Sequence, residues 1–378
     1  MDAATVQRNV AAIAEGFAKD RRERQVRRHL DPADFAALAE AGYLLTGVPA
    51  AMGGLWVDIP SSVRGICEIL RTLARGDPSV ALVSAMHPAV LSIWLNEPSS
   101  DPSWAEQQRF AAQEALNGAW WGTVTSEPGS GGDVMKTRTI AKRDADGTYR
   151  ISGQKHFGSG SGIMSYMFTS AIPEGEEGSD IFYLDVRGQP WDGSTGMKLV
   201  AEWDGHGMTA TQSHAFEFEN FPVVRIAPRE TTGFGSVGFV ANALFTAVIT
   251  GTVQSAVEAA RAQVVRKRDD LRPYELTEWA NVEQDAWLIN EAYEAILRTI
   301  EAKGPGAALE ALIAKTAIAR LCENVTRNLC TVIGGGSFNR TSHFGAAFED
   351  VRALGFLRPP WGLAYDQILA GVWTRYAG

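Results

Sequence analysis

The spacing of apolar residues changes twice along this chain of 378 residues, and this change limits the folds that it can adopt. Up to about residue 118 the apolar residues recur at helical spacing, beginning with the run from Val6 to Phe17. Two Asp-Pro pairs, Asp31-Pro32 and Asp77-Pro78, each provide an N-cap followed by proline at the first helical position. We therefore predict that the N-terminal part is helical.

The middle of the chain has a different pattern. From about residue 120 to residue 225, short β-prone runs alternate with turn signals such as Asp146-Gly147 and Asp192-Gly193. Short strands at this spacing favour a small barrel or sandwich over a parallel sheet. The helical spacing returns from about residue 236. We predict an α+β protein with a helical domain over residues 1–118, a β-barrel domain over 119–228 and a helical bundle over 229–378.

The composition argues against several classes of function. The 35 basic and 44 acidic residues give a net charge of −9, so we expect neither a nucleic acid nor a membrane surface as a partner. The three cysteines show no Cys-x-x-Cys spacing, which predicts neither a disulfide framework nor a metal site and suits a reducing cytoplasm. We see no uninterrupted apolar run of about 18 residues, and so we expect no transmembrane helix and no signal peptide.

Two glycine-rich motifs in the predicted barrel carry most of the information about function. Residues 125–133 read Thr-Ser-Glu-Pro-Gly-Ser-Gly-Gly-Asp, and residues 151–160 read Ile-Ser-Gly-Gln-Lys-His-Phe-Gly-Ser-Gly. Together they resemble the paired signature of the acyl-CoA dehydrogenases. With the order of helices, strands and helices, the resemblance covers essentially the whole chain. It implies the acyl-CoA dehydrogenase fold, with a C-terminal four-helix bundle, a bound flavin (FAD or FMN) and a homotetramer.

The residue types in the two motifs suit an isoalloxazine ring. Such a ring needs hydrogen-bond donors at its polar edge and a flat apolar wall against its face, and glycine lets the backbone approach closely. The family's pattern implies that the flavin contacts six residues of the two motifs: Thr125, Ser126, Gly131, Gly132, Phe157 and Ser159. Further along, Arg268 resembles the arginine that reaches a neighbouring subunit's pyrophosphate. Gly335 and Gly336 resemble the glycine loop beside the adenine.

The chain departs from the dehydrogenases of this family at the catalytic base. Those enzymes use a glutamate near the C-terminus, and the corresponding residue here is Arg358, whose pKa above about 12 prevents it from acting as a base. Some relatives take the base from an earlier helix, at roughly Ala241, but no Asp or Glu lies between residues 231 and 257. Arg358 could bind an anionic substrate or the negative charge of a flavin, or it could form a surface ion pair with Asp350 or Glu349.

The flavin monooxygenases of the same fold, such as dibenzothiophene monooxygenase, offer a better match. Their second motif often reads Phe-x-Ser-Gly, as in residues 157–160, and a histidine follows Asp-x-Ser, as His87 follows residues 77–79. The resemblance implies that Ser159 holds a flavin C4a-hydroperoxide, that His87 transfers a proton and that Arg358 lines the pocket of a small-molecule substrate. A separate flavin reductase would supply the reduced flavin. A histidine on an apolar helix can equally be a core residue.

Two other functions stay open at this point. The chain could be an acyl-CoA or acyl-carrier dehydrogenase with a different base, which would bind its flavin tightly and lose flavin colour with a thioester. It could also be a non-catalytic paralogue that keeps the fold and assembles with an active partner. The sequence does not identify the substrate.

Overall fold

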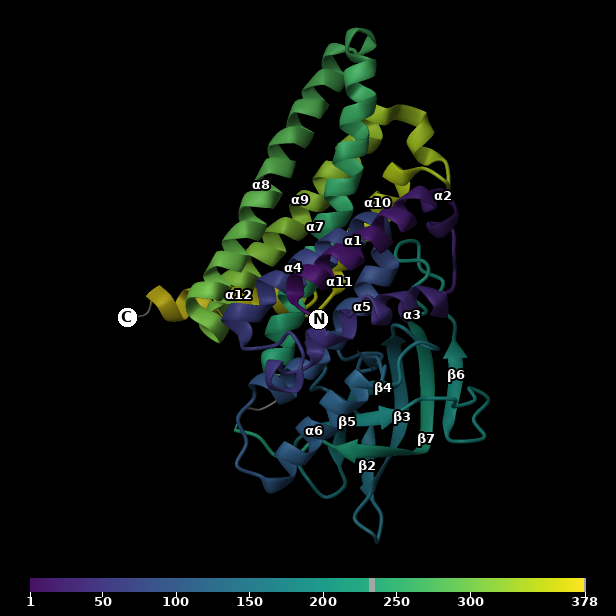
Figure 1. The fold of residues 1–378 in the computed structure, drawn as a ribbon, viewed down its shortest axis with the longest axis vertical. Helices are drawn as coiled ribbons and strands as arrows, with labels where there is room; N and C mark the ends of the chain where they lie inside the picture. Colours follow the sequence, from purple (N-terminus) through teal and green to yellow (C-terminus); the bar gives the residue numbers. More distant parts are fainter. Residues whose placement is uncertain (231–234, 377–378) are drawn as a thin grey trace.

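The computed structural model describes residues 1–230 and 235–376, and three parts follow one another along the chain (Figure 1). The first part is helical. Its α-helices are α1 (Ala3–Lys19), α2 (Arg21–Arg24), α3 (Pro32–Glu40), α4 (Ile59–Gly76), α5 (Pro78–Asn96) and α6 (Pro102–Leu116). Both predicted N-caps are confirmed, since Asp31 accepts a hydrogen bond from Ala33 N and Asp77 accepts one from Val80 N.

The second part is a seven-stranded sheet that closes on itself. Its strands are β1 (Trp121–Thr123), β2 (Ile140–Arg143), β3 (Tyr149–Gly158), β4 (Tyr166–Pro173), β5 (Asp180–Asp185), β6 (Met197–Ala201) and β7 (His214–Arg225). Hydrogen-bonded pairs run around the ring in the order β4, β2, β3, β7, β5 and back to β4. The predicted barrel is therefore confirmed, and β1 and β6 are added to β4 and β7.

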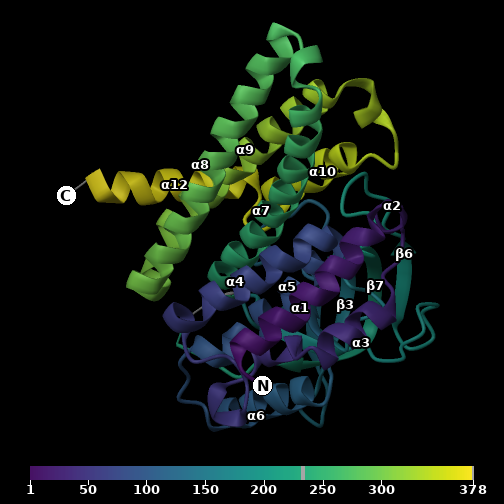
Figure 2. The same cartoon turned by 45° about the horizontal axis from the view of Figure 1, so that its top comes forward.

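The third part is a helical bundle. It contains α7 (Gly235–Arg266), α8 (Pro273–Lys303), α9 (Ala308–Ile333), α10 (His343–Val351), α11 (Ala353–Phe356) and α12 (Trp361–Tyr376). The long helices α7, α8 and α9 pack against one another, and their upper ends extend away from the barrel (Figure 1). Helix α12 runs out from the body of the protein toward the C-terminus (Figure 2). The order of helices, barrel and bundle thus agrees with the fold that the motifs imply.

Two helices of the core are long and apolar enough to cross a membrane, which the sequence analysis did not anticipate. They are α5 and α7, and 89% of the apolar stretch in each is buried inside the protein. Serine and histidine residues interrupt the apolar sequence of α5, and serine and threonine residues interrupt that of α7; several of these polar side chains are also buried. Burial on all sides explains why these helices are hydrophobic all round.

Candidate active site

The second motif ends in a strained segment that presents an aromatic ring. Phe157, near the end of β3, has a φ of 59°, in the left-handed region that non-glycine residues seldom adopt. The pairing of β3 with β7 shifts register between Lys155 and Gly158, and such a bulge re-aims a side chain. The Phe157 side chain is 54% exposed, and its ring meets the edge of Trp203 at 6.1 Å. Backbone strain of this kind is common at ligand sites.

A chain of hydroxyl groups continues from Phe157 into the loop between β6 and β7. Ser159 Oγ lies 2.6 Å from Ser213 Oγ, which lies 2.8 Å from Thr211 Oγ1. Thr211 donates its single hydrogen to Met208 O at 2.9 Å. Ser213 must then donate to Thr211, and Ser159 must donate to Ser213, because each hydroxyl has one hydrogen. This direction leaves Ser159 able to accept a hydrogen bond from a bound group, because its own hydrogen is donated to Ser213.

Arg358 reaches the first motif from the C-terminal part. It follows α11, donates from Nη1 to Gly132 O at 2.8 Å and donates from Nη2 to Ser126 Oγ. Gly132 has a φ of +83°, and a Cβ there would lie 2.5 Å from Pro360, so this close contact requires glycine. Burial lowers the pKa of Arg358 to about 10, and the nearby Asp133 offsets part of this effect. The residues in ranges 1–230 and 235–376 provide no ion pair for Arg358.

The alternative of a surface ion pair for Arg358 is wrong. Glu349 pairs instead with Arg352 at 2.7 Å, and Asp350 accepts a hydrogen bond from Met208 N at 2.6 Å. The Arg358 guanidinium is thus held by neutral oxygen atoms, which leaves its charge available to an anionic group.

A buried ion pair anchors the first motif to the barrel. Lys155, which is 0% exposed, donates to Glu127 at 2.7 Å and to Ser170 O at 2.6 Å. Burial alone would raise the pKa of Glu127, but bonds from Lys155, Thr137 and Arg138 N lower it to about 2. Burial lowers the pKa of Lys155 to about 8, against the effect of Glu127. The sequence analysis missed this pair, although both residues lie within the two motifs.

The residues at this place fit the requirements of a flavin ring. Gly129 and Gly131 have positive φ, and a side chain added at either would meet no atom within 4 Å, so the space above the turn is open. The hydroxyls of Ser126 and Ser159 can bind a polar ring edge, Phe157 can cover a ring face and Arg358 can neutralise negative charge. Thr125 is buried beside Ser126. The structure therefore brings the predicted residues of both motifs together with Arg358.

The predicted adenine-side and pyrophosphate residues are not gathered with this group. Arg268 lies in the connection between α7 and α8, at the far end of the bundle, and its guanidinium pairs with Asp269 at 3.2 Å (Figure 1). Gly335 and Gly336 lie in the 3-10 helix η5 (Gly334–Phe338) that follows α9, beside Phe338, which is 97% exposed. Within one chain these residues cannot complete a site at Ser126.

His87 is not placed to transfer protons. It is 0% exposed, its Nε2 lies 3.0 Å from Leu44 O and its Nδ1 accepts a hydrogen bond from Trp121 N at 3.4 Å. These two bonds fix a neutral tautomer with the proton on Nε2. Burial lowers the pKa of His87 to about 4, although the bond to Leu44 O acts in the opposite direction. The structure thus contradicts the predicted proton-transfer role and favours the core alternative.

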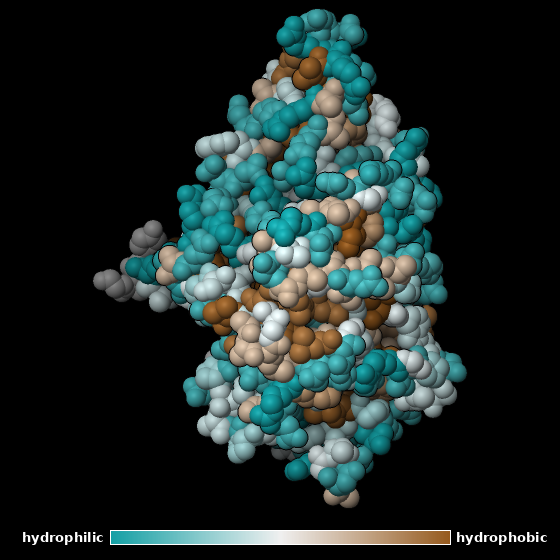
Figure 3. Space-filling view, viewed as in Figure 1, coloured by the Kyte–Doolittle hydropathy of each residue, from teal (hydrophilic) through white to brown (hydrophobic). Residues whose placement is uncertain are grey.

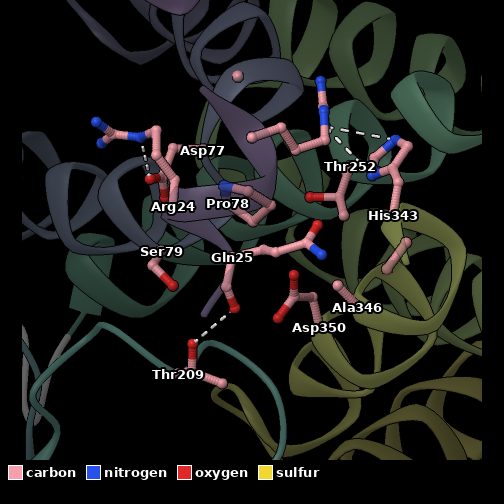
Figure 4. A pocket seen from close by; sticks show the side chains of 13 residues that line it. Arg24, Gln25, Asp77, Pro78, Ser79, Thr209, Thr252, His343, Ala346 and Asp350 are labelled. Carbon is pink, nitrogen blue, oxygen red and sulfur yellow. Dashed lines mark hydrogen bonds and ion pairs between the residues drawn. The ribbon is translucent and has the colours of Figure 1, made fainter. Parts of the chain in front are cut away.

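A small pocket lined mainly by polar residues lies beside Thr209, in the loop between β6 and β7 (Figure 4). Asp350 points into it from α10, and burial raises the pKa of this carboxyl to about 7. On the opposite side Arg24 binds Asp77 at 2.8 Å. None of the residues that the motifs predict lines the pocket. Because Asp350 accepts from Met208 N, we interpret this region as the support of the loop rather than as a second reaction site.

The sequence and the fold were compared with known proteins. Residues 122–221 match the family described as acyl-CoA dehydrogenase, middle domain. The amino sugar nitrososynthase DnmZ of Streptomyces peucetius is 25% identical over 350 residues, which cover 86% of this chain and 82% of DnmZ. Dibenzothiophene monooxygenase of Rhodococcus qingshengii is 26% identical over 290 residues, which cover 70% of this chain but 63% of that enzyme. The crystal structure of KijD3 in complex with FMN and a dTDP-linked amino sugar superposes with a TM-score of 0.82 at 20% identity, covering 98% and 94% of the two chains.

Proposed function

We propose that this chain, which belongs to the acyl-CoA dehydrogenase superfamily, is a flavin-dependent monooxygenase that oxygenates a small organic molecule. One observation carries the proposal: Arg358 stands where the dehydrogenases need a carboxylate, and it binds Ser126 and Gly132 of the flavin motif. A guanidinium there cannot remove a proton from an acyl thioester. It can stabilise negative charge, which suits an anionic reduced flavin. The sequence relatives are monooxygenases and nitrososynthases, which agrees with this choice.

The residues of the chain would hold the flavin and exclude water. A bound reduced flavin would supply the two electrons that O₂ needs for insertion of one oxygen atom. Ser126 would bind the polar ring edge, and Phe157 and Trp203 would form an aromatic wall. Because Ser159 donates its hydrogen to Ser213, its oxygen can accept a hydrogen bond from an N–H group of the reduced ring. A ring nitrogen of the oxidised flavin that carries no hydrogen could not donate such a bond.

We favour FMN over FAD as the cofactor. One observation in favour is that the structural relative KijD3 is described in complex with FMN. Arg268 is moreover followed by two aspartates, Asp269 and Asp270, which would repel a pyrophosphate. If Arg268, Gly335 and Gly336 contribute to the flavin site at all, a second copy of the chain must bring them.

We further propose a homotetramer that works with a separate flavin reductase in the cytoplasm. The apolar side chains on the face shown in Figure 3 gather at its middle, and Phe338 and Trp373 are strongly exposed. Such exposed apolar groups are typical of surfaces that another subunit covers. The cysteines Cys67, Cys322 and Cys330 are free thiols, which suits a reducing compartment.

Anaerobic titration tests this function against the dehydrogenase alternative. The purified protein, saturated with oxidised FMN or FAD, would be mixed with acyl-CoA thioesters of short, medium and long chain. We expect no loss of the flavin absorbance with any thioester, because the chain has no base at residue 358. Rapid bleaching by a thioester would instead establish a dehydrogenase. Fluorescence titration with both flavins in the same experiment tests the preference for FMN.

A further inference from the structure

A buried lysine of α9 holds the segment that carries Arg358. Lys315 is 2% exposed, and its Nζ donates to Leu357 O at 2.8 Å and to Pro359 O at 2.7 Å. These two carbonyl groups lie on either side of Arg358 along the chain. Lys315 thus fixes the backbone before and after the residue that reaches Ser126 and Gly132.

A buried lysine at this position costs folding free energy, which a residue that only filled space would not require. Burial lowers the pKa of Lys315 to about 8, and no carboxylate lies within ion-pair distance of its Nζ in the described parts of the chain. An apolar side chain of similar volume would avoid the cost of burying an ammonium group. The two carbonyl groups that Lys315 binds belong to the residues before and after Arg358, so these bonds fix the backbone from which the Arg358 side chain extends. This geometry indicates a role connected with Arg358.

We propose that Lys315 is a positioning residue of the flavin site, which keeps the guanidinium of Arg358 on Ser126 and Gly132 and thereby favours an anionic reduced flavin over a neutral oxidised one. The inference rests on the proposed function, since that function assigns the flavin to Ser126. It concerns a residue outside both motifs, on helix α9, whose Nζ binds the backbone on both sides of Arg358.

The test compares the affinities of the protein for oxidised FMN and for dithionite-reduced FMN under anaerobic conditions. The proteins are the wild type, Lys315→Met, Arg358→Met and the double variant. We expect Lys315→Met to lower the affinity for reduced FMN by about tenfold while changing that for oxidised FMN much less, as for a lost bond to a charged group. Lys315→Arg, which retains the charge and donors, should recover part of this loss. In the Arg358→Met background the Lys315 substitution should have no further effect.

Two controls accompany the affinity measurements, and the difference between reduced and oxidised FMN separates positioning from a merely structural role. Lys303→Met removes an exposed lysine that pairs with Glu310 at 3.1 Å and should leave both affinities unchanged. Hydrogen exchange of the amides of Leu357 and Arg358 should be faster in Lys315→Met, by about tenfold, whether or not flavin is present. An equal loss of affinity for both forms of FMN, or an undiminished effect in the Arg358→Met background, would overturn the proposal.

Failure of the proposed function gives a different result. If the wild type binds neither form of FMN, the assignment of the site is wrong, and the exchange experiment alone then decides about Lys315. Unchanged exchange at residues 357 and 358 would show that Lys315 does not hold the segment. Faster exchange would show that it does.

Discussion

Replacement of Lys155 by methionine tests whether the buried ion pair anchors the flavin motif. Burial and the bonds to Glu127 change both pKa values, from 4.5 to about 2 for Glu127 and from 10.5 to about 8 for Lys155. At neutral pH the lowered pKa of Glu127 favours folding, whereas the lowered pKa of Lys155 opposes it. The intact pair therefore combines a favourable and an unfavourable effect, as is typical of a buried ion pair. Removal of one partner is different, because it leaves a buried charge without its counter-charge.

We expect Lys155→Met to lower the free energy of unfolding by about 3–5 kcal/mol at pH 7. Glu127 would keep the donors Thr137, Thr139 and Arg138 N but lose the ammonium group. Its pKa in the folded variant should rise, because burial is then opposed by fewer bonds. The loss of stability should consequently shrink as the pH falls from 7 to 5, where the variant can protonate Glu127. In the wild type the stabilisation by Glu127 is present above pH 4.5 and is lost only as the pH falls toward 2.

Urea denaturation followed by tryptophan fluorescence measures this effect, through the midpoint at pH 7 and pH 5. The exposed Lys142→Met on β2 is the matched control and should change stability by less than about 0.5 kcal/mol. Combining Lys155→Met with Glu127→Gln should recover much of the loss, since it removes the unpaired charge. A loss below about 1 kcal/mol for Lys155→Met, or a double variant less stable than the single one, would refute the reasoning.

The site leads to three further predictions. Ser213→Ala should free the hydrogen of Ser159 for donation and lower the preference for reduced over oxidised FMN by several-fold, and Thr211→Val should act in the same direction. Fluorescence titration measures these preferences, and equal values in the wild type and both variants would contradict the direction of the hydroxyl chain. His87→Gln should lower the free energy of unfolding by about 1–3 kcal/mol through the lost bonds to the backbone. It should leave the reoxidation rate of bound reduced FMN unchanged. A changed rate in a variant that is still folded would instead support the predicted role of His87 in proton transfer. Asp350→Asn should increase stability at pH 8 more than at pH 5. Burial raises the pKa of Asp350 from 3.8 to about 7, so the folded wild type loses stability as the pH rises between these two values, whereas asparagine does not titrate. A gain independent of pH, in urea titrations at both values, would show that this carboxyl is not protonated near neutrality.

The sequence was sufficient for the fold because local signals agreed with one another. Proline after Asp31 and Asp77 marks two helix starts, and the turn signals separate the strands of a closed barrel. The paired glycine motifs indicated the resemblance to the acyl-CoA dehydrogenases, whose middle-domain family matches residues 122–221. The strand pairs that close the barrel, such as β5 with β7, could not be predicted from the spacing of apolar residues alone, because they join segments that are distant in the sequence.

The site was less predictable because side-chain contacts decide the chemistry. A bulge near the end of β3 turns the backbone of Phe157 to positive φ, and the motif itself does not reveal this bulge. His87 looked available on an apolar helix, and the backbone atoms that occupy both ring nitrogens come from segments far away in the sequence. The direction of the hydroxyl chain depends on Met208 O, and the role of Lys315 depends on the carbonyls beside Arg358. No local pattern reveals such contacts.

The most direct test of the monooxygenase function is the rate at which reduced FMN is reoxidised by O₂ on the protein. Anaerobic protein with one equivalent of reduced FMN would be mixed with oxygenated buffer in a stopped-flow instrument, and the recovery of the oxidised absorbance would be compared with that of free FMN. We predict a recovery slowed by at least about tenfold, since a site that uses oxygen must prevent the uncoupled reaction. Recovery at the rate of free FMN, at protein concentrations that saturate binding, would contradict the proposed function.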